Sequence, residues 1–329
     1  MRNPNSIPCI KFYFGIWMLS FIISFGGVAL AAADLGNDRK LEITYLGVVQ
    51  EIPTTTQQVG IWVPLASSRD GQTIVEREIS APTPYEITRD LRYENEMVHF
   101  LVQPPIPNTF RFEIKYHAVI GGQTPADSLS SDSRGKFLEP SRLMIVDEQV
   151  RQFSETATLG RNDTIQKSRG IYDFVLQYMK YDKTIPGWGR GDTARACRIG
   201  AGNCTDFHSL FISLALAARI PARFKIGVTV PEDQEGAIPG YHCWAEFYDD
   251  KTGWQAIDAS EAWKHPEKKE QYFRGFDVHK FLVSVGRDIE LVPKQKGEPL
   301  NFFFYPYVEV NGQPFAEIKT AVHYKNLKG

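Results

Sequence analysis

The spacing of apolar residues changes once along this chain, and that change limits the folds open to it. Between residues 41 and 120 apolar residues recur at every second position in short runs that Pro, Gly and Asn separate, at 41–49, 59–63, 73–79, 97–102 and 110–120. Short, regularly spaced runs with a period of two are typical of antiparallel β-sandwiches. We therefore predict a β-sandwich domain over residues 34–120.

A polar, serine-rich stretch at residues 121–134 is typical of an interdomain linker. Beyond it the period becomes helical, which predicts a helix of about 15 residues behind Asn162 and Asp163 and a second helix from near Cys204 to before Pro221. Strands are expected at 224–230, 242–248 and 254–260, and a hairpin at 302–310 and 314–319 around Asn311-Gly312. The fold class is thus α+β, with a second domain over 135–329 that ends in this β-hairpin.

The first 33 residues resemble a targeting segment. Arg2 and Lys11 are their only charges, residues 12–28 are apolar with Gly and Ser, and the small residues 29–33 suit cleavage. This pattern predicts a signal peptide over residues 1–33, with an uncleaved N-terminal membrane anchor as the alternative. We expect an exported protein, periplasmic or secreted, that has no membrane attachment once the signal is removed.

The net charge and the cysteine content exclude some classes of protein function and favour others. The net charge of −2 excludes electrostatic binding to nucleic acid, because phosphate affinity needs a basic excess. After residue 33 the chain keeps Cys197, Cys204 and Cys243, and an odd number in an oxidising compartment leaves one thiol unpaired. A structural disulfide between Cys197 and Cys243 is one pairing that leaves Cys204 free. The cysteines lack the paired spacing of zinc motifs, so no metal and no cofactor is predicted.

Three residues together fit nucleophilic catalysis. Asn203 is a capping residue type, so Cys204 is expected in the first turn of a helix, where free N–H groups lower a thiol pKa. A hairpin around residue 251 places His242 opposite Ser260 and diagonal to Asp258. If that register holds, Cys204, His242 and Asp258 are able to act as nucleophile, base and orienting carboxylate.

The segment from Arg198 to Ser260, RIGAGNCTDFHSLFISLALAARIPAR followed by GYHCWAEFYDDKTGWQAIDAS, resembles the core of the transglutaminase-like superfamily. The resemblance places the family's catalytic triad on Cys204, His242 and Asp258. It implies a papain-like α+β fold and acyl transfer through a thioester, with water or an amine as acceptor. The calcium dependence of the longer animal cross-linking enzymes is not implied, because this chain lacks their extra domains.

Several further residues are assigned roles around this site. The oxyanion is expected to bind the Cys204 N–H and a side chain from Tyr181 or Trp188, while Trp244 lines the site. Asp206 is expected to support the helix start. His208, one helical turn after Cys204, is expected to be a cap or surface residue, with tuning of the thiol as the alternative.

The sequence thus predicts an exported cysteine hydrolase or acyltransferase, protease-like in chemistry, that acts on peptide or cell-envelope amide substrates. A competing hypothesis is a catalytically silent module that binds peptide or glycan in the cell envelope. The ionisation of Cys204 separates the two, because binding alone does not require a thiolate. The sequence carries no prediction of an oligomeric state.

Overall fold

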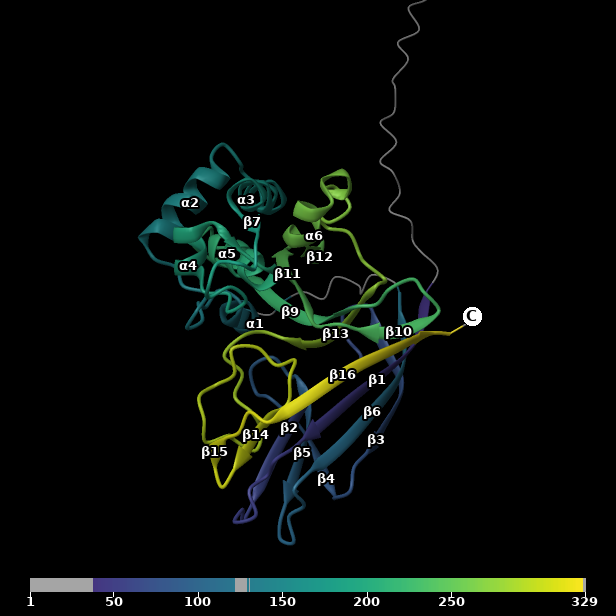
Figure 1. The fold of residues 1–329 in the computed structure, drawn as a ribbon. Helices are drawn as coiled ribbons and strands as arrows, with labels where there is room; N and C mark the ends of the chain where they lie inside the picture. The colour runs from purple at the N-terminus through teal and green to yellow at the C-terminus, as the bar shows by residue number, and fades with distance from the viewer. Residues whose placement is uncertain (1–37, 122–128, 130, 328–329) are drawn as a thin grey trace, which may run out of the picture. The chain divides into compact units, whose positions relative to one another are not determined.

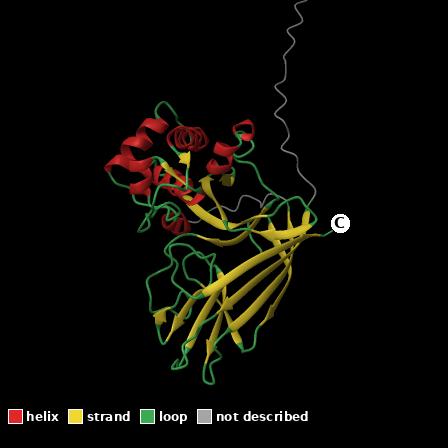
Figure 2. Cartoon of the chain, viewed as in Figure 1, coloured by secondary structure: helices red, strands yellow, loops and turns green. Residues whose placement is uncertain are grey.

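A computed structural model describes residues 38–121, 129 and 131–327 of the chain. The predicted signal peptide and most of the predicted linker lie outside these residues. Within them the fold is α+β, as predicted, with three antiparallel sheets and a short parallel pair (Figures 1 and 2). None of the helices in the described ranges combines the length and the apolar character that crossing a membrane would need.

Two five-stranded sheets form the sandwich. The first has the order β10-β16-β1-β6-β3, with bounds Glu235–Ile238, Ile318–Asn326, Arg39–Val49, Phe110–Ile120 and Gln72–Ser80. The second has the order β15-β14-β2-β5-β4, with bounds Gln313–Pro314, Tyr307–Val310, Val59–Leu65, Glu96–Val102 and Tyr85–Arg89. Alternate side chains of β1 and β6 are buried, and Phe112 of β6 stacks on Phe100 of β5 at 6.0 Å between ring centroids.

The third sheet supports the helices. Its order is β12-β11-β9-β13, with bounds Gly253–Ile257, His242–Asp249, Ala222–Thr229 and Lys280–Val285. The helices are α1 to α6, with bounds Ser131–Lys136, Glu148–Thr158, Thr164–Tyr178, Thr193–Ile199, Cys204–Ala217 and Ala259–Lys264, and a 3-10 turn, η1, spans Pro266–Lys268. The pair β7 (Lys180–Tyr181) and β8 (Ala201–Gly202) is parallel. Helix α5 is almost wholly buried, because it packs on β9 and β11 and against α2, α3 and α4.

The C-terminal strands belong to the sandwich sheets. Strand β16 pairs with β1 along nine residue pairs, from Leu41 with Asn326 to Val49 with Ile318, and β14 pairs with β2 (Figure 1). The hairpin predicted at 302–310 and 314–319 is shorter in the structure, where β14 (Tyr307–Val310) pairs with β15 (Gln313–Pro314). It belongs to the second sandwich sheet, and β16 belongs to the first. Alternation along a strand predicts that the strand has a buried face, but it does not say which strand lies beside it.

Most predicted elements around the site are confirmed. Helix α3 begins behind its cap Asp163 and has 15 residues, and α5 begins behind Asn203. The strand predicted over 254–260 is wrong in its last part, because it ends at Ile257 and Asp258 caps α6. Sequence reasoning also missed α2, α4 and β4.

Candidate active site

Cys204 lies at the start of α5 because Asn203 caps this helix. The Asn203 side chain accepts a hydrogen bond from the Thr205 N–H at 2.9 Å, and the Asp206 carboxylate accepts one from the Asn203 N–H at 2.9 Å. This reciprocal pair is a capping box, which puts the thiol beside the free N–H groups at the positive end of the helix. The role predicted for Asp206 is confirmed.

The glycine-rich loop before α4 is tied to the same capping box. The N–H groups of Gly189 and Gly191 donate to Asp206 at 2.7 and 3.1 Å. Both glycines have positive φ, and a Cβ on Gly191 would lie 2.4 Å from Ser209 Oγ. Burial raises the pKa of Asp206, and these loop N–H groups oppose that rise because they stabilise the carboxylate. The loop that carries Trp188 is therefore fixed to the start of α5.

The thiol and the imidazole shift each other's protonation. A hydrogen bond from the Cys243 thiol lowers the pKa of Cys204 well below its usual range, burial opposes this, and His242 lowers it further by hydrogen bond and charge. Burial alone would lower the pKa of His242, but Asp258 and Cys204 together raise it to about 10. Both directions favour a thiolate beside an imidazolium near neutral pH.

Asp258 holds the imidazole through a single ring nitrogen. His242 Nε2 lies 2.6 Å from Asp258 Oδ2, and the carboxylate is 1% exposed. The observed register of β11 with β12, Ala245 opposite Ile257, is the even register that the sequence argument required. Asp258 Oδ1 accepts hydrogen bonds from the Ser260 hydroxyl and the Glu261 N–H, both at 3.0 Å. The carboxylate therefore caps α6 and binds the imidazole at once.

Residues 151–259 match the model of the transglutaminase-like superfamily. These 109 of the 329 residues are similar to a transglutaminase-like domain. A curated protein of Haemophilus influenzae, named only as an uncharacterized protein, is 28% identical over 223 residues. That alignment covers 58% of this chain and 60% of the relative, so the chain matches less than two thirds of the relative's length.

Solved structures that are similar to this chain include the following two. A Cytophaga hutchinsonii structure described as a "Putative Cysteine Protease" aligns with a TM-score of 0.59 at 18% identity, and the match covers 89% of this chain and 92% of that one. At this identity the likeness concerns the fold. The periplasmic domain of TgpA from Pseudomonas aeruginosa aligns with a TM-score of 0.38 at 15% identity, over 73% of this chain and 93% of that one.

The three aromatic residues predicted to line the site differ in their burial and in their neighbours. Trp244 is buried and its indole stacks on the His242 ring, with centroids 6.4 Å apart. Tyr181 is half-buried, and its ring packs beside that of Phe207 of α5, with the two ring centroids 6.2 Å apart. Burial raises the pKa of Tyr181, and the charge of Cys204 adds to this rise. Trp188 is 40% exposed, with the Lys183 ammonium 5.4 Å from its ring.

Three residues of this site were missed or misplaced by sequence reasoning. Lys280 Nζ lies 2.7 Å from Asp258 Oδ2. No sequence motif predicts this contact, because Lys280 is a single charged residue at the start of an otherwise mostly apolar strand. His208 is fully buried and not at the surface: its Nε2 accepts the Ala259 N–H at 3.1 Å. Its position four residues after Cys204 was the available signal. The Tyr241 hydroxyl bonds Asn203 Nδ2 at 3.2 Å and Thr205 Oγ1 at 3.0 Å, on either side of Cys204.

The predicted disulfide is absent, since Cys197, Cys204 and Cys243 are all free thiols. Cys243 points at α5, with its Sγ 3.6 Å from His208 Nδ1 and 3.7 Å from Thr205 Oγ1. Cys197 lies on α4, where burial raises its pKa to about 12. Burial also raises the pKa of Cys243. Among the described residues no cluster of three or more His, Cys, Asp or Glu side chains is arranged to hold a metal ion.

A second group of buried charges lies on the same sheet, and we call it the Asp70 cluster: Asp70, Arg223, Lys225 and Glu246. Glu246 accepts from Arg223 Nε at 2.6 Å and from Lys225 Nζ at 2.7 Å. Asp70, from the connection between β2 and β3, lies 2.8 Å from Arg223 and 3.1 Å from Lys225. The Arg223 guanidinium stacks over Trp254 at 4.1 Å. This cluster joins the sandwich to the third sheet.

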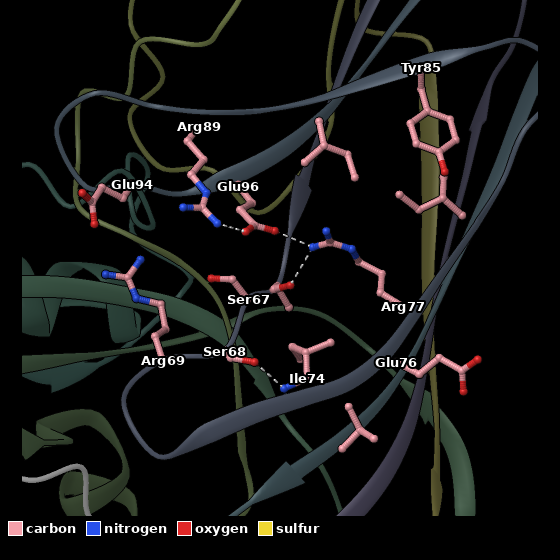
Figure 3. A pocket seen from close by; sticks show the side chains of 14 residues that line it. Ser67, Ser68, Arg69, Ile74, Glu76, Arg77, Tyr85, Arg89, Glu94 and Glu96 are labelled. Carbon is pink, nitrogen blue, oxygen red and sulfur yellow. Dashed lines mark hydrogen bonds and ion pairs between the residues drawn. The ribbon is translucent and has the colours of Figure 1, made fainter.

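A cavity of about 580 Å³ lies in the sandwich, between the edge strands β3 and β4 (Figure 3). Arg77 and Arg89 flank Glu96 there, each 2.6 Å from one of its oxygens. Ile74, Ile79 and Ile87 supply apolar lining. Cys204, His242 and Asp258 are not among its lining residues, so this cavity is separate from the candidate active site.

Proposed function

We propose that this protein is an exported thiol enzyme that cleaves amide bonds and transfers the acyl group through a thioester on Cys204. The observation that carries the proposal is the pairing of a helix-start cysteine with an imidazole that Asp258 binds through Nε2. Nδ1 is then the ring nitrogen left for the thiol, because imidazole has only two. A nucleophile, a base and an orienting carboxylate are the parts that thiol-dependent acyl transfer needs.

The proposed reaction has two halves. The Cys204 thiolate attacks the amide carbonyl carbon, a carbon–sulfur bond forms, and the carbonyl π electrons move to oxygen. The intermediate then collapses, the carbon–nitrogen bond breaks, and the His242 imidazolium gives its Nδ1 proton to the departing amine. In the second half the neutral imidazole takes a proton from water or an amine that attacks the thioester, and the thiolate leaves.

The oxyanion of each intermediate needs donors that are in place beforehand. The Cys204 N–H is one of the first four in α5 and has no partner within the helix. We propose Tyr181 as the side-chain donor, in preference to Trp188, because Tyr181 packs on α5 and responds to the charge of Cys204. The proposed substrates are peptide or cell-envelope amides, and export is proposed from the apolar run at residues 12–28.

The deciding experiment measures the pH dependence of Cys204 alkylation by iodoacetamide, with the modified peptide identified by mass. We expect a rate that stays high below pH ~7, because the thiolate is stabilised by the imidazolium. Cys197 and Cys243 serve as internal controls, since the pKa of each is raised and neither is expected to react at that pH.

The His242→Ala variant completes the test. We expect it to lose the low-pH plateau and to react only as pH approaches ~8.5, the range of an ordinary thiol. A wild-type protein whose alkylation already rises only near that pH would instead support the silent binding module.

A further inference from the structure

Asp258 binds two cationic side chains at one oxygen. Its Oδ2 lies 2.6 Å from His242 Nε2 and 2.7 Å from Lys280 Nζ. Asp258 and His242 are buried, and the Lys280 side chain is 9% exposed. One carboxylate is enough to orient the His242 imidazole. The reaction steps proposed above therefore give the Lys280 ammonium no role.

His208 does not share Oδ2 with these two side chains. Its Nε2 is 3.5 Å from the other carboxylate oxygen, Asp258 Oδ1, and the Ala259 N–H donates to the same nitrogen at 3.1 Å. Its Nδ1 lies 3.6 Å from Cys243 Sγ. Among the described residues, Lys280 and His242 are therefore the side chains that contact Asp258 Oδ2.

On the basis of the proposed function, we propose that Lys280 is a positioning residue: its ammonium shares Asp258 Oδ2 with His242 and keeps this carboxylate ionised when the imidazole becomes neutral. In the resting site, two anions, Cys204 and Asp258, balance two cations, His242 and Lys280. After acylation the sulfur is neutral in the thioester, and the imidazole has lost its proton to the amine. Only Asp258 and Lys280 then remain charged, and the site is again neutral.

Without Lys280 the acylated site would hold a buried carboxylate with no cation. Such a charge is costly, so the carboxylate would hold on to a proton or the imidazole would keep its own. Either outcome opposes the second half of the reaction, which needs a neutral imidazole as base. Lys280 thus prevents Asp258 from binding the imidazolium too strongly.

The strand that carries Lys280 is fixed from the sandwich. The Gln72 amide bonds the backbone of Leu282 with its nitrogen at 3.0 Å and its oxygen at 2.8 Å. Asn95 bonds the backbone of Val285 in the same way, at 2.7 and 2.8 Å. Both amides come from sandwich segments, so the sandwich sets where β13 presents its lysine.

The other titratable groups near this cluster come from every element around it: Cys204 and His208 of α5, Cys243 of β11, Glu261 of α6, Tyr172 of α3, Tyr181 of β7, and Tyr272 and Asp277 before β13. Burial alone would raise the pKa of Asp258, but Lys280 first and His242 next hold it well below its usual range.

The test is an NMR titration of the His242 ring in a Cys204→Ser background, which removes the thiolate and needs no substrate. In the full chain with this substitution, we expect Lys280→Met to raise the pKa of His242 by about one unit or more, because Asp258 then interacts with the imidazolium alone. Lys280→Gln, which keeps a hydrogen-bond donor without the charge, should shift it in the same direction and serves if the Met variant does not fold. Lys280→Arg should restore the parent value.

Lys225→Met is the matched control. Lys225 is also a buried lysine of this sheet, and it faces the same Trp244 ring at 5.9 Å, against 5.4 Å for Lys280. The carboxylate partners of Lys225 are Glu246 and Asp70. We therefore expect the Lys225→Met substitution to lower the melting temperature and to leave the pKa of His242 unchanged. An unmoved pKa in both Lys280→Met and Lys280→Gln would overturn the inference, whereas failure of the alkylation experiment would overturn the proposed function alone.

Discussion

Two clusters of buried charge lie on one sheet and share the Trp244 ring between their lysines, yet they are built differently. The Asp70 cluster pairs two carboxylates with one lysine and one arginine, and an arginine does not titrate in proteins. The cluster around Asp258 replaces the arginine with a histidine, whose other nitrogen remains for a thiol. One histidine in place of one arginine therefore separates a site that can move a proton from one that cannot.

The two clusters also differ in the parts of the fold that they connect. Asp70 reaches the third sheet from the connection between β2 and β3, so its cluster spans two parts of the fold. Asp258, His242 and Lys280 all come from the sheet or its edge, and the sandwich side chains Gln72 and Asn95 bond the backbone of β13, which carries Lys280. Substitutions in the first cluster should lower stability, and substitutions in the second should lower activity.

The largest effect is expected for Asp258→Asn. An amide at this position can fix the wrong imidazole tautomer, so we expect turnover by the folded protein to fall by about 10,000-fold. The measurement is kcat on an amide or ester reporter substrate, with circular dichroism as the control for folding. A loss below tenfold would mean that Asp258 mainly caps α6.

The next largest effect is expected for Glu246→Gln. Removing one carboxylate leaves Arg223 and Lys225 buried with too little negative charge, so the free energy of unfolding should fall by about 3–5 kcal/mol. Urea unfolding measures this, and the alkylation rate of Cys204 below the unfolding transition should stay within twofold. Glu290→Gln, which breaks the exposed pair with Lys294, is the control and should change nothing measurable. An equal loss in both variants would contradict the contrast.

The smallest effect is a difference in pH dependence. Lys225 and Arg223, together with Arg69 beside the cluster, hold the pKa of Asp70 below its usual range against burial. The stabilising contribution of Asp70 is therefore present above pH ~4 and lost as pH falls further. The pKa of His242 is raised, so its contribution is full below pH ~6.5 and is lost as pH rises toward 10. In Cys204→Ser, which removes the thiol's opposing titration, unfolding free energy should therefore decline above pH ~6.5. Adding Asp70→Asn should flatten only the acid side.

The sequence carried enough to locate the three proposed catalytic residues, because each depends on a local rule. Asn203 is a cap, the turn after Asp249 keeps an even register, and Asp258 follows from that register. Lys280 and His208 depend on contacts between segments far apart in the chain, and no local pattern distinguishes a lysine beside a carboxylate from one in water. The structure supplied Lys280 and the burial and partners of His208, along with the free state of Cys197 and Cys243.

The same limit explains the misplaced C-terminal strands. The Asn311-Gly312 turn was predicted, and both residues adopt the positive φ that such a turn requires. Its partners were not, because β14 pairs with β2, more than 240 residues earlier, and periodicity carries no information over that separation.

The pairing of β16 with β1 has a consequence for how the chain folds. Strand β1 has β6 on one side and β16 on the other, and β16 comes last among the described strands. Until residues 318–326 have been synthesised, one edge of β1 presents unpaired N–H and C=O groups, and such an edge is a template for aggregation. Closing a loop of nearly the whole chain is also slow. Among the described residues, the sandwich is therefore completed only by the last strand, β16, although β1 is the first strand.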